Sequence, residues 1–295
     1  MSDNPVFLVL DGHNIAYRSF FAIRGLTTRD GRPSNALFGF VKAWRSLQNS
    51  VRPTHGCVVF DGGPPTERLA RFPEYKAQRP AMPEELRGQF AAIEEFLGLS
   101  GVPIFREPAQ EADDVIATLA GAAARDGAAV RIASNDKDLS ALVGPRIRLI
   151  VPAGRAVGVE GTEIGPEDVH ARCGVPPERV LEWLALTGDA SDNVPGVPGI
   201  GPKTAARLLA DYGSLAGLWE RLTEVTPDRI RQKLADSRLL VERNVELMRL
   251  RTDLPLARGW RDCALAAAAP SALRAFYARW DFDSLIRELA EPRLF

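Results

Sequence analysis

Three short apolar runs, each followed by an aspartate, constrain the fold more than any other feature of the sequence. Residues 6–10, 57–60 and 130–133 are rich in Val, Leu, Ile and Phe, and each ends at a turn-forming segment, so we predict three buried strands. Helical patterns lie between and around them, at about residues 14–23, 35–48, 84–98 and 110–125. Strands that alternate with helices are typical of a mainly parallel sheet in a three-layer α/β domain.

The residues that close these strands carry the first functional signal. Asp11, Asp61 and Asp136 follow the three apolar runs. Because the carboxyl ends of parallel strands meet at one edge of a sheet and form its ligand crevice, we expect these carboxylates to converge there.

Further acidic side chains occur in three tight clusters. Taken alone, each cluster is explained about as well by a structural role, as a helix cap or as acids that complement a helix dipole, as by a functional one. Three independent caps would not explain why strand-end aspartates join them. With the strand-end residues, the set of nine is Asp11, Asp61, Glu111, Asp113, Asp114, Asp136, Asp138, Asp189 and Asp192.

Carboxylates that share a crevice repel one another, so they cannot all stay ionised without help. Either some of them are protonated or bound cations offset the repulsion. Oxygen ligands favour hard cations, so we predict Mg²⁺ or Mn²⁺. Two such ions would suit an in-line phosphodiester displacement. If these nine acids bind cations, the formal net charge of the remaining residues is +8, compared with −1 for the whole chain. A nearly neutral chain can therefore present a basic surface around an acidic site.

Residues 66–79 combine cations with aromatic side chains. Taken alone, the segment is more typical of a solvated helix face, but it follows Asp61 directly and should overhang the crevice. Arginine and lysine interleaved with aromatics suit phosphates and unstacked bases. Its members are Arg68, Arg71, Phe72, Tyr75, Lys76 and Arg79.

Beyond about residue 165 the strand signals end, and residues 166–251 are typical of short helices separated by Pro and Gly turns. In the turn at 199–203, Gly199 and Gly201 would let the backbone approach a phosphate at a helix N-terminus, and Lys203 would add a charge. The turn does not match a nucleotide P-loop. A final helix is expected at about 281–290.

Several classes of protein are disfavoured by composition. No apolar run approaches the roughly 20 residues that span a bilayer. The first residues lack the basic flank and apolar core of a signal peptide. Three widely separated cysteines do not indicate a disulfide framework. We therefore expect a cytoplasmic monomer that does not act on membranes.

An ordered set of motifs runs through nearly the whole chain. It comprises Asp11-Gly-His-Asn14, Tyr17-Arg18, Val59-Phe-Asp61, Tyr75-Lys-x-x-Arg79, Glu111-Ala-Asp-Asp114, Asp136-Lys-Asp138, Gly188-Asp-x-Ser-Asp-Asn193 and Gly199-Ile-Gly-x-Lys-Thr-Ala205. In this order the motifs resemble the 5′-nuclease domain of bacterial DNA polymerase I, in the flap endonuclease family. The resemblance implies a PIN-like α/β catalytic domain over 1–168, with a helical arch at about 64–86. It also implies a C-terminal helical DNA-binding domain over 169–295, with a helix–hairpin–helix motif at about 194–210.

The resemblance further implies a structure-specific 5′→3′ exonuclease and 5′-flap endonuclease that hydrolyses DNA by a two-metal mechanism in primer removal and repair. The first Mg²⁺ or Mn²⁺ would be served by Asp11, Asp61, Glu111, Asp113 and Asp114. The second would be served by Asp136, Asp138, Asp189 and Asp192, with Asp113 near both. Lys76 and Arg79 would steady the scissile phosphate, and the predicted catalytic set is Lys76, Arg79, Asp11 and Asp113.

The implied DNA contacts lie in two places. Near the crevice they are Tyr17, Arg18, Arg68, Arg71 and Tyr75. At the hairpin they are Gly199, Gly201, Lys203 and Thr204, with a monovalent cation such as K⁺ on the turn carbonyls. The implied partners are 5′ flaps, nicked or branched duplex and RNA primer ends, with a DNA polymerase acting in trans, at the bacterial nucleoid.

Two departures from the family pattern accompany the resemblance. The chain ends at Phe295 without a polymerase, so we expect either a stand-alone relative or an excised domain. Glu67 stands where relatives often carry an aromatic residue. Two other functions stay open: a junction-binding module without activity, which the intact acidic set disfavours, and a ribonuclease of the PIN class, which the hairpin and basic arch disfavour.

Overall fold

The central element of this computed structural model is one sheet, and the model describes residues 4–151, 161–266 and 268–290. In these residues six strands run in the order β3-β2-β1-β4-β5-β6, all parallel except β6, which is antiparallel to β5. Their bounds are β1 (Val6–Asp11), β2 (His55–Val59), β3 (Ile104–Phe105), β4 (Ala129–Ala133), β5 (Ile147–Val151) and β6 (Thr162–Ile164).

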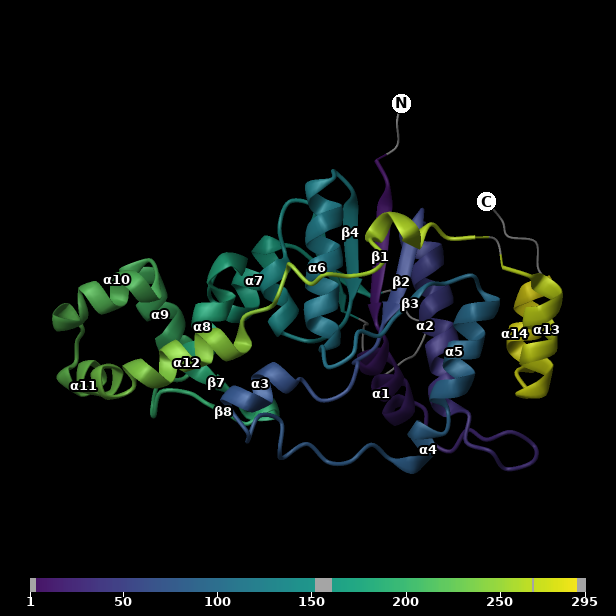
Figure 1. The fold of residues 1–295 in the computed structure, drawn as a ribbon, viewed down its shortest axis with the longest axis horizontal. Helices are drawn as coiled ribbons and strands as arrows, with labels where there is room; N and C mark the ends of the chain where they lie inside the picture. Colours follow the sequence, from purple (N-terminus) through teal and green to yellow (C-terminus); the bar gives the residue numbers. More distant parts are fainter. Residues whose placement is uncertain (1–3, 152–160, 267, 291–295) are drawn as a thin grey trace.

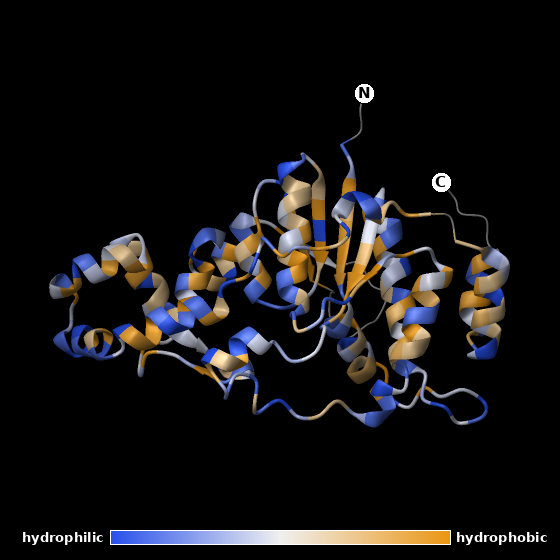
Figure 2. Ribbon diagram, in the orientation of Figure 1, coloured by the Kyte–Doolittle hydropathy of each residue, from blue (hydrophilic) through white to orange (hydrophobic). Residues whose placement is uncertain are grey.

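Alternate residues of the strands enter two separate hydrophobic cores. In β1, Leu8 and Leu10 pack in the core on one face, and Phe7 and Val9 pack in the core on the other. Figure 1 shows helices on both sides of the sheet. In Figure 2 the strands are largely coloured as hydrophobic. A sheet covered on both faces needs nearly continuous apolar strands, which is the pattern that the sequence has. The covering helices are α1 (Gly12–Ala22), α2 (Asn35–Val51) and α5 (Phe90–Leu99) on one face and α6 (Ala112–Arg125) on the other.

The predicted strands are confirmed as β1, β2 and β4, and the α/β class is confirmed. The sequence analysis did not identify β3, β5 or β6. β3 has two residues and β6 has three, so neither is long enough to show alternation, and each pairs with a single neighbour at an edge of the sheet.

The single helix predicted at 84–98 is wrong in one respect, because the structure has α4 (Glu84–Arg87) and α5 with a break between them. Gln89 lies at the break and is buried. Its Oε1 accepts the backbone N–H of Leu37 at 2.9 Å, and its Nε2 donates to Asn35 Oδ1 at 2.9 Å. The break thus carries a buried polar side chain that satisfies polar groups of α2.

Past β6 the chain is helical, apart from the short pair β7 (Gly188–Asp189) and β8 (Val194–Pro195). These helices form the lobe labelled α7 to α12 in Figure 1. Among the described residues, no helix combines the length and apolar character needed to cross a bilayer. The bounds are α7 (Pro166–Cys173), α8 (Val180–Thr187), α9 (Pro202–Tyr212), α10 (Leu215–Glu220), α11 (Asp228–Asp236) and α12 (Arg238–Met248).

After α12 the chain returns to the sheet, so the described residues beyond α12 do not all pack with the helical lobe. The backbone N–H of Leu265 donates to the Thr54 carbonyl beside β2. The last helices, α13 (Pro270–Arg279) and α14 (Asp283–Ala290), lie beyond α5 in Figure 1. Phe276 and Tyr277 of α13 stack near Phe96 of α5 and belong to the same core as α1 and α2.

We expect Phe276→Ala to lower the free energy of unfolding by about 3–5 kcal/mol, because the ring is 2% exposed and its removal leaves a cavity. Leu239→Ala is the matched control, because Leu239 is 80% exposed and should change stability by less than about 0.5 kcal/mol. Urea unfolding measures both. Equal effects of the two substitutions would contradict the docking of α13 on the core.

Candidate active site

β1 and β2 bring Asp11 and Asp61 to one edge of the sheet. Asp11 is the last residue of β1 and caps α1, so its Oδ1 accepts the Asn14 N–H at 3.0 Å. Its Oδ2 accepts the Ser134 hydroxyl, which follows β4, at 3.0 Å. Asp61 follows β2, and its Oδ1 accepts the Ala112 N–H at the start of α6 at 2.8 Å. The predicted convergence of strand-end carboxylates is therefore tied together by hydrogen bonds among three strand ends and a helix.

The turn after Asp61 depends on a glycine. A Cβ on Gly62 would lie 1.6 Å from the Glu107 carbonyl oxygen, which is far inside van der Waals contact. Without a side chain, Gly62 donates its N–H to the Gln110 carbonyl at 2.9 Å. This close approach holds the loop before α6 against the end of β2 and sets the position of Asp61.

The first turn of α6 sends its three acids in different directions. Asp113 faces the groove described below. Glu111 precedes the helix and is buried against the cations of the segment after β2. Asp114 is 1% exposed and accepts hydrogen bonds from Arg68 and from the Arg251 N–H. Neighbours in sequence thus have different surroundings, because a helix turns by about 100° per residue.

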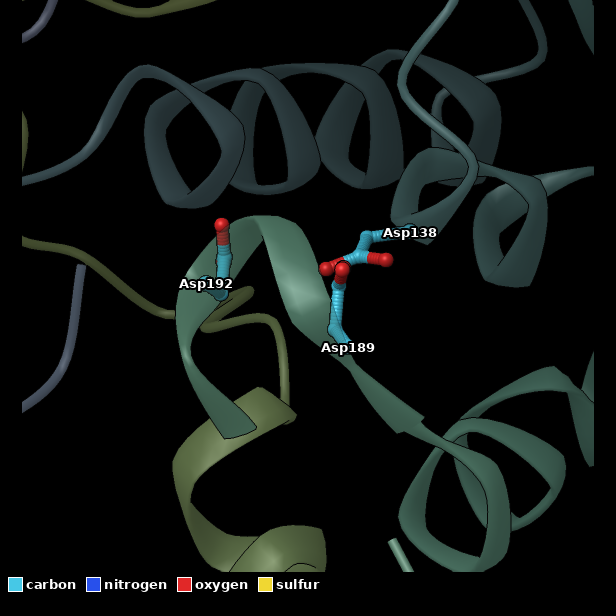
Figure 3. Close-up of side chains that lie close together, drawn as sticks. All are labelled: Asp138, Asp189 and Asp192. Carbon is cyan, nitrogen blue, oxygen red and sulfur yellow. The ribbon is translucent and has the colours of Figure 1, made fainter. Parts of the chain in front are cut away.

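A compact acidic group lies beside the turn at residues 188–195. Asp138, Asp189 and Asp192 each place one carboxylate oxygen within 4.8 Å of the others' (Figure 3). Asp189 also accepts hydrogen bonds from the Ser191 N–H at 2.9 Å and hydroxyl at 2.7 Å. Asp138 Oδ1 is buried and has no hydrogen-bond partner. A buried carboxylate oxygen without a donor is a costly arrangement that a cation would relieve.

The pKa values of these acids reflect their burial first and the crowding of negative charge second. Burial, followed by the charges of Asp61 and Asp136, raises the pKa of Asp11 to about 7. Burial, followed by Asp136, Asp189 and Asp192, raises the pKa of Asp138 to about 8.

Two more acids follow the same trend. Burial raises the pKa of Asp113 well above its ordinary value, with Asp136 and Asp11 adding to the effect. The pKa of Asp136 is also raised, by burial first. Asp189 behaves differently, because hydrogen bonds from Ser191 and the Lys137 ammonium outweigh burial and lower its pKa. Most of the group therefore favours protons or cations.

The segment between β2 and α4, which contains α3 (Thr66–Arg71), lies over these acids. Lys76 Nζ contacts Glu111 and lies 3.6 Å from Asp192 Oδ2. Arg79 NH2 donates to Asp192 Oδ1 at 2.6 Å. The Tyr75 hydroxyl donates to Asp192 Oδ2 at 3.0 Å. The predicted overhang of the basic segment is present in the structure.

The backbone of this segment is also attached to the acidic turn. Lys76 has a φ of 57°, which is uncommon for a residue other than glycine, and its N–H donates to the Asp192 carbonyl at 3.0 Å. The carboxylates of Glu111 and Asp192 raise the pKa of Lys76 against the opposing effect of burial. The ammonium is therefore held as a cation at the acidic edge.

A groove of about 870 Å³ opens beside the acids. Asp11, Asp61, Asp113 and Asp136 line it, together with Lys76 and Arg79. Tyr17 and Arg18, which the sequence analysis proposed near the site, also line it, whereas Arg68, Arg71 and Tyr75 do not. Further lining residues that the sequence analysis did not propose as site residues are His13, Asn14, Phe21, Arg24, Met82 and Asn135.

A periodic signal for some of these residues was present in the sequence. Tyr17 and Phe21 are four apart on α1 and therefore share one helix face, and their rings are 6.4 Å apart. Phe21 is 62% exposed, which is unusual for a large apolar side chain. Arg24 follows the end of α1, and only the fold places it beside the acids.

The glycine turn, residues 196–201, lies in the helical lobe between β8 and α9, and the acidic turn at 188–195 separates it from α8. Gly199 has a φ of 79°, and Gly199, Gly201 and Lys203 are all exposed. α9 begins at Pro202, whose carbonyl accepts the Trp183 indole N–H from α8 at 3.1 Å. The turn leads directly into α9 with Gly199 and Gly201 facing solvent, and α8 lies before the predicted range of 194–210.

Comparison with known proteins identifies the fold. Residues 6–174 match the family described as 5′-3′ exonuclease, N-terminal resolvase-like domain, and residues 175–271 match 5′-3′ exonuclease, C-terminal SAM fold. The chain is 40% identical over 284 residues to the thermostable DNA polymerase I of Thermus thermophilus, and 40% identical over 294 residues to DNA polymerase I of Rhizobium leguminosarum. These alignments cover 95% and 97% of this chain but 33% and 28% of the relatives, so the chain spans about a third of their length.

Solved structures agree in fold. The 5′-exonuclease of bacteriophage T5 with bound zinc is 25% identical with a TM-score of 0.69, and the match covers 97% of this chain and all of that one. The catalytic core of Rad2 in complex with a DNA substrate is 18% identical with a TM-score of 0.62, over 98% of this chain and 93% of that one. The predicted fold and the predicted class of enzyme, a 5′ nuclease, are confirmed, and the chain belongs to the 5′-3′ exonuclease family.

Proposed function

We propose that this chain is a divalent-metal-dependent nuclease that hydrolyses DNA phosphodiesters at 5′ ends, flaps and branched duplex. The observation that carries the proposal is the gathering of carboxylates from β1, β2, the start of α6, the β4 end and the 188–195 turn at one sheet edge, beside a groove lined by cations. Acids alone would repel a phosphate, so the arrangement makes sense for a phosphate substrate only with cations between the two.

The residues fit a pair of hard cations. Asp138, Asp189 and Asp192 already bring three oxygens together, and Asp138 Oδ1 lacks a donor. Asp11, Asp113 and Asp136 face the groove with raised pKa values, so bound cations would offset their mutual repulsion. An all-oxygen set suits Mg²⁺ or Mn²⁺. The further predicted ligands are Asp61, Glu111 and Asp114.

Mg²⁺ or Mn²⁺ bound there would activate water and neutralise charge that develops on the phosphate. Cationic side chains of the protein would also contact the phosphate. Lys76 and Arg79 lie at the groove and, once a phosphate enters, their donors can turn from Glu111 and Asp192 to its oxygens. Tyr17 and Phe21 present rings to the groove, where unpaired bases can stack.

The glycine turn at the start of α9, which does not line the groove, would hold duplex DNA. Exposed Gly199 and Gly201 leave backbone free to approach a phosphate, and Lys203 and Thr204 follow in the first turn of α9. Such contacts address the phosphate backbone and carry no base sequence. K⁺ on the turn carbonyls stays a prediction.

The wider setting follows from the relatives. A T5 flap endonuclease structure is described as a pseudo-enzyme-product complex with DNA and metal ions. By that likeness we propose flapped or nicked duplex and RNA primer ends as substrates, and primer removal and repair at the bacterial nucleoid as the process. A monomeric state and a polymerase acting in trans stay predictions.

Cleavage of a 5′-labelled flap duplex tests the function. We expect Mg²⁺ or Mn²⁺ to support cleavage near the junction, Ca²⁺ not to support it, and chelator to abolish it. Asp136→Asn should remove cleavage while flap affinity stays the same or rises, because the carboxylate repels phosphate. Asp228→Asn is the matched control, since that side chain is 84% exposed on α11, and it should behave as wild type.

Full cleavage in excess chelator would contradict the proposal. Tight flap binding without cleavage under every metal condition would instead favour a junction-binding module. Preferential cleavage of single-stranded RNA would favour a ribonuclease.

The raised pKa values predict how metal-free protein responds to pH. Asp11 and Asp138 bind protons more tightly in the folded chain, at about 7 and about 8, than at their ordinary value of 3.8. The unfolded state therefore loses protons first, and we expect the melting temperature in chelator to fall as pH rises from about 5 to 8. Mg²⁺ should reverse the fall, because it binds the ionised folded state.

Asp138→Asn should flatten that pH profile, because the amide does not ionise, whereas Asp228→Asn should leave it unchanged. Differential scanning fluorimetry across the pH series, with and without Mg²⁺, measures all three proteins. A melting temperature that rises steadily from pH 5 to 8 in chelator would show that the carboxylates are not crowded as the structure has them.

Lys203→Ala should weaken binding of duplex DNA to a similar extent on all sequences. It should also lower the slope of log K against log salt by about 1, because one phosphate contact is lost. Saturating DNA should restore the cleavage rate, since Lys203 does not line the groove beside the acids. Fluorescence anisotropy with a flap duplex and a single strand over a salt series checks this, and an equal loss for both ligands would overturn the assignment of the hairpin to duplex.

A further inference from the structure

Arg68 points inward from the segment that carries the proposed DNA contacts. Its side chain is 13% exposed. NH1 contacts Glu111 and donates to Asp114 Oδ2 at 2.6 Å, and NH2 donates to Asp114 Oδ1 at 3.0 Å. Two main-chain carbonyls complete the set: Nε donates to Leu247 at 2.9 Å, and NH2 donates to Arg249 at 3.0 Å. Each nitrogen of the guanidinium therefore already donates to the protein.

Arg71, on the same short helix α3, gives the contrasting case. Its side chain is 69% exposed, and its NH1 lies 3.3 Å from Glu246, which is equally open to solvent. An exposed pair of this kind is weak, so its arginine can exchange the partner for a phosphate at little cost. Arg68 has no such freedom, because leaving its site would strand buried carboxylates without a counter-charge.

The carboxylate of Asp114 is likewise fully occupied by hydrogen bonds from the protein. Both of its oxygens accept from Arg68, Oδ1 also accepts the Arg251 N–H at 2.8 Å, and the residue is 1% exposed. A carboxylate that is surrounded by protein donors offers little to a cation. The Arg68–Asp114 pair thus joins α3, the first turn of α6 and the segment that follows α12.

Glu111 differs from Asp114 in what else reaches it. Besides Arg68, it contacts Lys76, and the Tyr75 hydroxyl lies 3.3 Å from each of its oxygens. Lys76 lines the groove and, in the proposed function, turns to the phosphate when DNA enters. Arg68 would then be the fixed partner that keeps the Glu111 carboxylate directed at the acidic edge.

We propose that Arg68 is a positioning residue of the metal site, with Asp114 as its clamp, in place of the DNA contact and metal ligand predicted for the two residues from the sequence. Arg68 holds the Glu111 carboxylate and the start of the arch segment in place before DNA binds. The proposal rests on the proposed metal-dependent function, and it concerns only how the carboxylates are held.

Binding of Mn²⁺ alone to the DNA-free protein, followed by electron paramagnetic resonance, tests the proposal. Residues that orient metal ligands typically change metal affinity 10–100-fold, so we expect Arg68→Ala to weaken Mn²⁺ binding by at least about 10-fold. Arg68→Lys should fall between Arg68→Ala and wild type, because an ammonium keeps the charge but cannot donate to both oxygens of Asp114 and to the two carbonyls.

Arg71→Ala supplies the matched control on the same helix. It should leave Mn²⁺ binding unchanged and should weaken flap binding, with a salt slope lower by about 1. Arg68→Ala should show the reverse pattern, with flap affinity in Ca²⁺ and its salt slope close to wild type. Circular dichroism and melting temperature establish that each variant is folded. If Arg68→Ala does not fold, Arg68→Lys takes its place in the comparison.

The outcomes distinguish failure of the proposed metal-dependent function from failure of the positioning role of Arg68. If wild type binds no Mn²⁺, the proposed function itself fails. If wild type binds Mn²⁺ and a folded Arg68 variant binds it equally well, the positioning role is overturned while the proposed function stands. If that variant also loses flap affinity and salt slope as Arg71→Ala does, Arg68 is a phosphate contact.

Discussion

Mutual repulsion among carboxylates at one sheet edge is the constraint on which the rest of the structure depends. Asp11, Asp113, Asp136 and Asp138 all have raised pKa values, and burial is the largest cause in each. A fold that buries like charges together must hold them rigidly, or they would separate into solvent. The sheet provides that rigidity because both of its faces are covered by helices and its strands belong to two cores.

Lysine and arginine side chains of the segment between β2 and α4 reduce the same repulsion among the carboxylates. Lys76 and Arg79 reach Glu111 and Asp192, and Arg68 is enclosed by Glu111 and Asp114. These cations differ in what they can reach. Lys76 and Arg79 line the groove, where in the proposed function they exchange carboxylate for phosphate. Arg68 does not line it, and each of its guanidinium nitrogens already donates to the protein. The segment over the acids thus places Lys76 and Arg79 beside the groove, and its buried Arg68 joins it to Glu111 and Asp114.

Much of this could be predicted from the residues. Apolar runs that end in aspartate predicted β1, β2, β4 and the edge where Asp11, Asp61 and Asp136 lie, because a buried parallel strand requires continuous apolar character. Short edge strands such as β3 and β6 escaped prediction, since two or three residues show no period. The break between α4 and α5 also escaped it, and the partners of the buried Gln89 at that break, Asn35 and Leu37, are more than 50 positions away in the sequence.

The sequence by itself determined which residue types serve the site and which segments carry them, because the chemistry of oxygen ligands and phosphate-binding cations is a property of the side chains. Only the tertiary structure decided which partner each one meets. Arg68 and Arg71 are three apart on one helix, yet one is enclosed and the other open. Asp113 and Asp114 are adjacent, yet one faces the groove and the other an arginine. Pairing of this kind depends on chain segments far apart in sequence, so no local pattern encodes it.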